Sequence, residues 1–320
     1  CVQDGFFILL NRTNRTISLF GVDQQGGAPF DKINLANLEA EAQLDDLEIQ
    51  PGSRLSSAHH LTRSPKEREK VYFASLEGSF NSSGVLEPGG VLKFKVAGKK
   101  LQTIDYQPTR GAVHHLDLTP DGEYILQGTT EDGTGKLYVI NAGADADAPM
   151  SIAAIIDAGK GAGHVFYSAV RNLGIVTNHD DNFLSVVDMD HDDDGNIDDP
   201  VTWTTTEVWI PRGTTYDDFG NVDDHGNIGR DATRGASQKI QAHTASVSGI
   251  DPQEQYYYAV AAADGVFYRI DLEDLDKYTN PGDDFPTEDM LDVETEYGDS
   301  YLIQGDYNWN EPGGPMGGMP

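Results

Sequence analysis

Residues 113–118 read Val-His-His-Leu-Asp-Leu, and the turn sequence Thr-Pro-Asp-Gly follows at 119–122. Two further apolar runs, at 124–126 and 136–140, are separated by a polar stretch that contains glycine, and a fourth run covers 151–156. Short runs rich in β-branched and aromatic residues, broken by Gly, Asn and Asp, are typical of antiparallel strands. Four such strands in about 50 residues predict one blade of a β-propeller.

The central hairpin of this unit recurs along the chain. Five copies are recognisable, at residues 8–20, 71–94, 124–140, 175–187 and 256–271. The first and fourth copies superpose without a gap, so that Asn11 falls on Asn178 and Ser18 on Ser185. We therefore expect an all-β protein, a β-propeller of four-stranded antiparallel blades. Five blades are recognisable, and six or seven are expected if residues 24–57 contain further strands.

One propeller domain is expected over residues 1–305. An Asp- and Gly-rich stretch at about 188–240 interrupts the repeat and is interpreted as an acidic insertion. Strands within 288–305 are expected to complete the first blade, because a closed ring leaves no exposed strand edge. Residues 306–320 are rich in Gly, Pro and Met, and they predict an extended tail.

The repeated unit resembles the YVTN family of β-propellers. Its elements are a strand that ends in Asn, a polar turn, a strand that ends in Asp, and Pro-Asp-Gly before the hairpin. The resemblance covers most of residues 6–276. It implies the fold, commonly with seven blades, and says little about function, because one fold carries many functions.

The net charge of the chain is −31, from 22 basic and 53 acidic side chains. Residues 1–110 hold 13 of each sign, so the whole excess belongs to residues 111–320. A negative field repels phosphate backbones and anionic lipid surfaces, which excludes nucleic acid as a partner and favours cations. The sequence has no apolar run long enough to span a membrane, so no transmembrane segment is expected.

The one cysteine of the chain is Cys1, which rules out internal disulfides and Cys-rich metal sites. A mature bacterial lipoprotein carries its lipid on a cysteine at this position, so a lipid anchor at Cys1 is one interpretation. The other is a processing boundary that falls at a cysteine. Three Asn-x-Ser/Thr triplets, at Asn11, Asn14 and Asn81, are compatible with an extracytoplasmic protein, whether periplasmic, cell-surface or secreted.

Histidines occupy related positions in successive blades. His60 lies five residues before Pro65, and His115 lies five before Pro120, so His59-His60 superposes on His114-His115. A shift of 50 residues then places His114 on His164. We therefore expect His59, His114 and His164 to occupy one structural position, with His60, His115 or His243 nearby.

The first strand of a blade lines the central channel, so these imidazoles are expected to converge at one mouth of the channel. Nitrogen ligands suit copper or zinc, and copper is the preferred assignment. Because neutral imidazole is the ligand form, metal binding is expected to weaken as the pH falls through about 6.5. The alternative interpretation is a structural repeat residue that forms hydrogen bonds between blades.

The pairs Ala58-His59-His60 and Val113-His114-His115 resemble the blade openings of the nitrous oxide reductase propeller. That resemblance implies a copper centre held by histidines from several blades. This chain has no Cys-rich electron-entry domain, and its single cysteine forbids one. The resemblance therefore supports a metal at the channel mouth and does not extend to the reductase reaction.

Residues 190–198 read Asp-His-Asp-Asp-Asp-Gly-Asn-Ile-Asp and predict a calcium loop. Alternate Asp side chains in a tight turn supply the hard oxygens that Ca²⁺ requires, and Gly195 permits the turn. The expected ligands are Asp190, Asp192, Asp194, Asn196 and Asp198. Val201 stands where an EF-hand has its closing Glu, so Asp199 or a distant carboxylate would complete the shell; the alternative is a solvated acidic turn.

Three functional interpretations remain open from the sequence. The first is an extracytoplasmic metal-binding propeller with a copper-type histidine site and a structural calcium loop. The second is a non-catalytic, secreted or surface-anchored module that binds protein or glycan. The third is a structural subunit of an extracellular assembly, with protein partners or further copies of itself. Whether the protein is an enzyme stays open, because the sequence has no Walker, GxSxG or HExxH motif.

Overall fold

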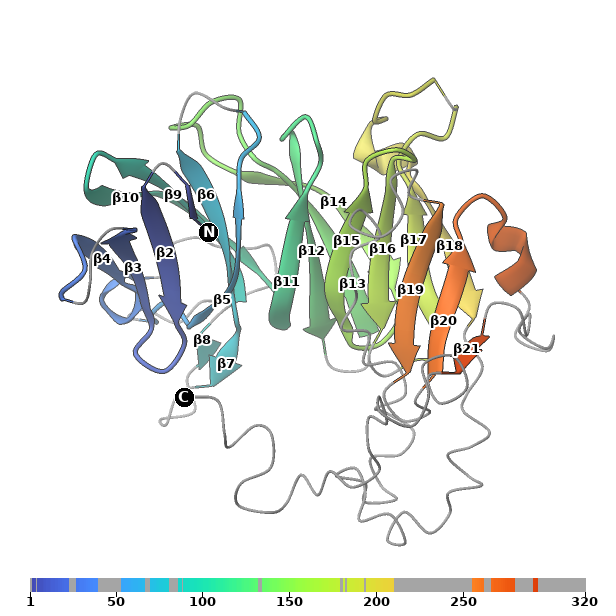
Figure 1. Ribbon diagram of the computed structural model, residues 1–320, viewed down its shortest axis with the longest axis horizontal. Coiled ribbons are helices and arrows are strands. Elements are labelled where there is room, and N and C mark those ends of the chain that lie inside the picture. Colours follow the sequence, from blue (N-terminus) through green and yellow to red (C-terminus); the bar gives the residue numbers. More distant parts are fainter. Residues whose placement is uncertain are drawn as a thin grey trace, which may run out of the picture.

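The computed structural model describes residues 2–3, 5–22, 27–39, 53–66, 70–80, 86–87, 89–131, 134–178, 181, 183–192, 194–209, 255–261, 266–279 and 290–292. In this part of the chain, five sheets follow one another in sequence order and lie side by side (Figure 1). The N-terminal four are four-stranded, and the fifth has three strands. Every pairing within them is antiparallel, and the protein is a β-propeller.

The elements of the first two blades are β1 (Val2–Gln3), β2 (Phe6–Asn11), β3 (Thr16–Gly21), β4 (Asp31–Asn34), η1 (Leu35–Asn37), β5 (Ala58–Arg63), β6 (Val71–Leu76), β9 (Gly89–Ala97) and β10 (Lys100–Thr109). A small hairpin pairs β7 (Ser79–Phe80) with β8 (Leu86–Glu87). The elements of the third blade are β11 (Ala112–Leu118), β12 (Tyr124–Glu131), β13 (Thr134–Asn141) and β14 (Ser151–Ala158).

The elements of the fourth blade are β15 (Ala162–Ser168), β16 (Leu173–Asn178), β17 (Phe183–Asp188), η2 (Pro200–Thr202) and β18 (Thr204–Trp209). Those of the fifth are β19 (Tyr256–Ala261), β20 (Val266–Asp271), η5 (Leu275–Tyr278) and β21 (Met290–Asp292). No helix among the described residues is long and apolar enough to cross a membrane.

The hairpin expectations are confirmed in all five blades, because the hairpins are β2–β3, β6–β9, β12–β13, β16–β17 and β19–β20. The superposition of the first and fourth copies is also confirmed. Ser18 pairs with Leu9, and Ser185 pairs with Val176, so the two serines hold the same ladder position relative to Asn11 and Asn178. In the fourth blade, Asn178 Nδ2 donates to Ser185 Oγ at 3.0 Å and to the Phe183 carbonyl at 2.9 Å, which closes the hairpin.

Three expectations about the repeat boundaries are corrected. Residues 31–34, inside the interval proposed to hide extra blades, form the outer strand of the first blade. Residues 204–209, assigned to the acidic insertion, form the outer strand of the fourth blade. Residues 290–292 pair with β20 as the outer strand of the fifth blade and do not complete the first, whose inner strand is β1. Residues 210–254 and 293–320 lie outside the described residues.

Successive blades pack face to face through apolar side chains, which is what the alternation along each strand dictates. One cluster joins the first and second blades through Ile17, Leu19 and Leu76. Others join the second to the third, the third to the fourth and the fourth to the fifth. These interfaces hold the inner strands of successive blades in fixed relation.

Lys93 is an exception within this apolar packing. It lies on β9 with 1% of its surface exposed. Its ammonium group donates to the carbonyl oxygens of Ala142, Asp145 and Ala148 at 2.8, 2.9 and 2.8 Å. These carbonyls belong to the β13–β14 connection of the next blade, so the lysine ties two blades together. All three of its hydrogens have acceptors, which offsets the cost of burying the charge.

Replacing Lys93 with Met is expected to destabilise the protein, because three carbonyls lose their donor inside a packed interface. The expected loss in the free energy of unfolding is about 2–4 kcal/mol, measured by urea denaturation. Lys95→Met is the matched control, two residues along the same strand, where the ammonium forms a surface pair with Asp147 at 2.6 Å. Surface pairs contribute about 1 kcal/mol or less, so equal losses in the two variants would contradict the structural role of Lys93.

Candidate metal centre

The inner strands of three successive blades share one irregularity. The pairing of β5 with β6 shifts between Ala58 and Leu61, that of β11 with β12 between Val113 and Leu116, and that of β15 with β16 between Ala162 and His164. At each place two residues of the inner strand oppose one residue of the next strand, which is a β-bulge. Bulges re-aim side chains, and here each bulge contains histidine.

The bulge corrects the predicted histidine register. The second residue of the bulge is His60 in β5, His115 in β11 and His164 in β15. The first residue is His59, His114 and Gly163 in the same three strands. The equivalent histidines are therefore His60, His115 and His164, and the predicted set of His59, His114 and His164 is wrong by one residue in two of the three blades.

Backbone donors at two of the bulges are held by the residue opposite. The His60 N–H donates to Ser75 Oγ at 2.8 Å, and the His164 N–H donates to Thr177 Oγ1 at 3.3 Å. In the middle blade the opposite residue is Gly128, where a Cβ would lie 3.0 Å from the carbonyl oxygen of Ala162. A side chain has no room there, because β15 approaches too closely.

The three equivalent imidazoles form one contiguous group, defined here as the histidine row. The ring centroids of His60 and His115 are 3.7 Å apart, and those of His115 and His164 are 5.5 Å apart. Phe166 continues the group, with its centroid 5.2 Å from that of His115, and Tyr257 of the fifth blade lies 6.1 Å beyond it. Sequence reasoning missed both aromatic residues, although Phe166 follows His164 by two residues and so shares its side of the strand.

His115 is fixed by a hydrogen bond across the blade boundary. Its Nδ1 lies 2.9 Å from the carbonyl oxygen of Val165 on β15. A carbonyl only accepts, so Nδ1 carries the proton and Nε2 of the neutral ring keeps its lone pair. A histidine that binds a metal usually donates its other ring N–H in this way, to a carbonyl or carboxylate.

Burial keeps two imidazoles of the row, His60 and His115, uncharged. Desolvation, with a smaller contribution from the neighbouring His59, lowers the pKa of His60 to about 4. Desolvation and the nearby His60 lower the pKa of His115 to about 3, against the hydrogen bond to Val165. Both rings are therefore neutral at pH 7, which is the form that binds metal.

Asp117 was not predicted as a functional residue. It lies two residues beyond His115 on β11, and its carboxylate accepts the Tyr167 N–H of β15 at 3.1 Å and the Leu118 N–H at 2.9 Å. Desolvation raises the pKa of Asp117 to about 6, despite these two backbone hydrogen bonds. His115 and Asp117 together bind the open edge of β15 at Val165 and Tyr167, in the place of a further strand.

The other predicted histidines do not occupy the second bulge position that defines the row. His59 is exposed at the first bulge position of β5. His114 holds the same backbone position in β11, and His243 lies outside the described residues. Among the described residues, the one set of three candidate ligands with donor atoms within 4.8 Å of one another is Asp190, Asp192 and Asp194. The three imidazoles are thus neighbours, but their ring nitrogens do not all lie within 4.8 Å of one another.

The acidic loop between β17 and β18 is held in a tight turn by hydrogen bonds to its own carboxylates. Asp190 Oδ1 accepts the Asp194 N–H at 3.0 Å, and Asp190 Oδ2 accepts the Gly195 N–H at 2.9 Å. Gly195 has φ of 85°, a conformation that favours glycine. The Asp194 carboxylate accepts from the Asn196 backbone, and that of Asp198 accepts the His191 N–H at 2.8 Å.

The loop is anchored to the core on its inner side. Ile197 packs against the cluster between the third and fourth blades, and the Trp203 indole donates to the Asp198 carbonyl at 3.0 Å. Trp203 in turn meets Tyr124 of the third blade edge to face, with ring centroids 5.8 Å apart. Asp199, a suggested further ligand, accepts the Val201 N–H at the start of η2.

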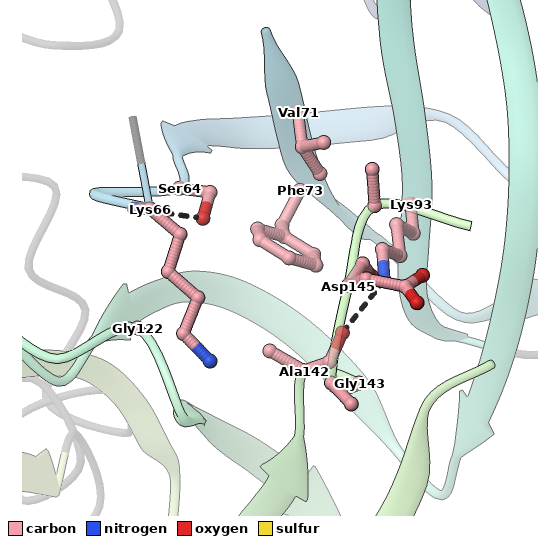
Figure 2. A pocket seen from close by; sticks show the side chains of 11 residues that line it. Ser64, Lys66, Val71, Phe73, Lys93, Gly122, Ala142, Gly143 and Asp145 are labelled. Atoms are coloured by element: carbon pink, nitrogen blue, oxygen red, sulfur yellow. Dashed lines mark hydrogen bonds between the residues drawn. The ribbon is translucent and has the colours of Figure 1, made fainter. Parts of the chain in front are cut away.

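A cavity of about 310 Å³ lies between the second and third blades (Figure 2). Phe73, Lys66 and the buried Lys93 line one side, and residues 142–146 line the other. Lys66 and Ser64 follow the C-terminal end of β5, whereas His60 lies near its beginning. The cavity is therefore separate from the histidine row, and the ammonium of Lys93 is already satisfied by carbonyls within it.

No protein-family model matches the chain, and no curated protein matches its sequence. The resemblances to YVTN-type propellers and to nitrous oxide reductase therefore stay predictions. Solved structures do match. The periplasmic gluconolactonase PpgL of Pseudomonas aeruginosa is 13% identical with a TM-score of 0.52, over 84% of this chain and 64% of that chain.

Two further structures are similar. A functionally unknown protein from Desulfotomaculum acetoxidans DSM 771 is 11% identical with a TM-score of 0.48, over 88% of this chain and 64% of that one. The β-propeller domain of Cps50 (Swd1) from Myceliophteria thermophila is 11% identical with a TM-score of 0.46, over 87% and 71%. The chain thus spans 64% of the length of the first two structures. At such identities the likeness concerns the fold alone.

The low pKa of His115 predicts a pH-dependent stability. In the unfolded state His115 has an ordinary pKa near 6.5, whereas in the folded state its pKa is about 3. Between these pH values the unfolded state binds a proton that the folded state does not bind, which favours unfolding. The contribution is complete above pH 6.5 and is lost as the pH falls, by at most about 1.4 kcal/mol per pH unit. His115→Asn keeps a donor for Val165 and removes the titration.

Denaturant unfolding of both proteins from pH 7.5 to 4.5 measures this effect. The stability of the original protein is expected to fall relative to that of His115→Asn below pH 6.5. Because Asp117 is present in both proteins, its opposite titration cancels in the comparison. Parallel curves would show that His115 titrates normally in the folded state.

Calcium is expected to raise the melting temperature of the protein through the acidic loop. A ligand that binds only the folded state stabilises it by about 2.7 kcal/mol at 100 times its Kd. Asp192→Ala combined with Asp194→Ala should abolish the shift in differential scanning calorimetry. Asp147→Ala combined with Asp157→Ala removes the same charge at two exposed carboxylates and should retain it. The loop binds no calcium if neither Ca²⁺ nor a chelator moves the melting temperature.

Proposed function

We propose that this propeller is an extracytoplasmic metal-binding protein whose histidine row, His60, His115 and His164, binds a transition-metal ion at the channel mouth. The observation that carries the proposal is the shared bulge: three successive inner strands present an imidazole at one equivalent position, and the rings lie in contact. Copper is the preferred ion, because imidazole nitrogen suits it and it leads the affinity order of the divalent metals.

Two features of His115 support this proposal. Its Nδ1–H is committed to the Val165 carbonyl, which leaves Nε2 as the ligand atom. Its low pKa, like that of His60, means that protons compete with the metal only in strongly acidic solution. The sequence-based expectation of weakening near pH 6.5 is thereby moved to lower pH. Binding requires side-chain rotation that brings the nitrogens to about 2 Å from the ion.

The acidic loop is proposed as a structural calcium site on the outside of the fourth blade. Asp190, Asp192 and Asp194 have donor oxygens within 4.8 Å of one another, the spacing that a shared cation needs. Asn196 and Asp198 stand at the next alternate positions of the loop. Ordering this loop would stabilise the interface that Ile197 and Trp203 form with the third blade.

A second candidate function is a non-catalytic interaction module for a protein or glycan. One observation favours it: β1 pairs with β2 only at Phe6 and Phe7, so no described strand pairs with that edge of β2 from Ile8 to Asn11. Leu9 is 47% exposed along this stretch. An open strand edge is a surface on which an extended segment can add.

Metal titration of the full chain, first stripped of metal by chelator, tests the proposed function. Isothermal titration with Cu²⁺ or Zn²⁺ at pH 7.5 is expected to show a site that His115→Asn and His60→Asn each weaken at least about 10-fold, as the loss of a ligand should. His191→Asn is the control, because His191 is exposed in the acidic loop. Unchanged affinity in both row variants would reject the histidine row as the site and leave the interaction module.

A further inference from the structure

Asp117 lies two residues along β11 from His115, the central residue of the histidine row. It and His115 are on the same side of β11, since both contact the edge of β15. Residues two apart on a strand are separated by about 6.6 Å. His60 and His115 are neutral at pH 7, because burial lowers the pKa of each ring. A cation bound there would lie in a desolvated site with one carboxylate nearby.

Among the described inner strands, this carboxylate occurs in the third blade only. The positions equivalent to Asp117, counted from the bulge, are Thr62 on β5 and Phe166 on β15. The third blade therefore supplies both His115, whose ring contacts the other two imidazoles, and Asp117, the nearby carboxylate. Neither neighbouring blade repeats this arrangement.

Resting on the proposed metal site, we propose that Asp117 controls which ion binds there without touching the ion: it is a positioning residue that clamps β11 to β15, and its negative charge favours divalent over monovalent ions. The clamp acts through the Tyr167 N–H, two residues from the Val165 carbonyl that orients His115. The counter-charge acts through space. Its attraction for an ion scales with the charge of that ion, so it is twice as large for Zn²⁺ or Cu²⁺ as for Cu⁺.

Asp117→Asn separates the two roles. An Asn oxygen can still accept the Tyr167 N–H, so the clamp to β15 is retained, while the charge and the acceptor for the Leu118 N–H are lost. Outer-shell substitutions commonly cost about 10- to 100-fold in metal affinity. We expect Asp117→Asn to weaken Zn²⁺ binding about 10-fold and Cu⁺ binding about 3-fold, the square root that half the ionic charge implies. Asp117→Ala, which loses both roles, is expected to weaken both ions further.

The experiment compares Zn²⁺ and Cu⁺ affinities of the full chain at pH 8 by competition with chromophoric chelators, with thermal unfolding of each variant alongside. Asp105→Asn is the matched control, since Asp105 also accepts a backbone N–H from the next blade, that of Met150 at 2.6 Å, away from the row. Asp105→Asn should leave both metal affinities unchanged.

Each outcome has one meaning. Selective loss of Zn²⁺ affinity in a folded Asp117→Asn variant supports the proposal. Unchanged Zn²⁺ affinity, equal losses for the two ions, or the same loss in Asp105→Asn overturns it. Should Asp117→Asn fail to fold, Asp117→Glu keeps the charge, and retained Zn²⁺ preference in that variant supports the proposal while its loss overturns it. If the unmodified protein binds neither ion, or binds both without His115, the proposed function itself fails, which is a different result.

Discussion

Every inner strand of a propeller has one edge that no further strand of its own blade can cover, and the architecture of this protein depends on how that edge is satisfied. On β15 two side chains of the preceding blade form hydrogen bonds with this edge: His115 donates to the Val165 carbonyl, and Asp117 accepts the Tyr167 N–H. Unpaired backbone groups in a desolvated place are costly, so these contacts join the third and fourth blades at their inner strands. The same contacts orient the central ring of the histidine row.

The bulge is the second part of this arrangement. A regular strand would send residues 114 and 115 to opposite faces, and their neighbours in other blades would alternate likewise. Because the bulge inserts one residue at the same level in β5, β11 and β15, the second residue of each lies beside its counterpart in the neighbouring blade. Three imidazoles from distant parts of the sequence consequently lie in one row, and burial keeps His60 and His115 neutral at pH 7.

These features explain what could be predicted from the sequence. Hairpins depend on local alternation and turn residues, so all five were predictable, as was the match of Ser18 with Ser185. The histidine register was predictable only in part: the count to Pro65 and Pro120 matched His60 with His115 correctly, but the shift of 50 residues that placed His114 on His164 is one residue too long, because Gly163 occupies the first bulge position in β15. Asp117, between two leucines, carries no signal of its partner 50 residues away. Lys93 likewise gives no sign in an apolar strand that its acceptors lie in the next blade.

The two candidate cation sites, the acidic loop and the histidine row, differ in charge and in ligand type. The acidic excess belongs to residues 111–320, and the acidic loop between β17 and β18 gathers three carboxylates, of which Asp192 and Asp194 are exposed and Asp190 is buried. The imidazoles of the row lie on the inner strands of the second to fourth blades, and those of His60 and His115 are neutral at pH 7. Calcium prefers oxygen and copper or zinc prefers nitrogen, so each class of ion has one matching environment here.

The fourth blade contributes to both environments, through β15 to the histidine row and through the β17–β18 connection to the acidic loop. Trp203 links this loop to Tyr124 of the third blade. Ordering of the loop therefore acts on the third and fourth blades, the same two blades that His115 and Asp117 join at their inner strands. The stability of the acidic loop and the geometry of the histidine row consequently depend on one interface between blades.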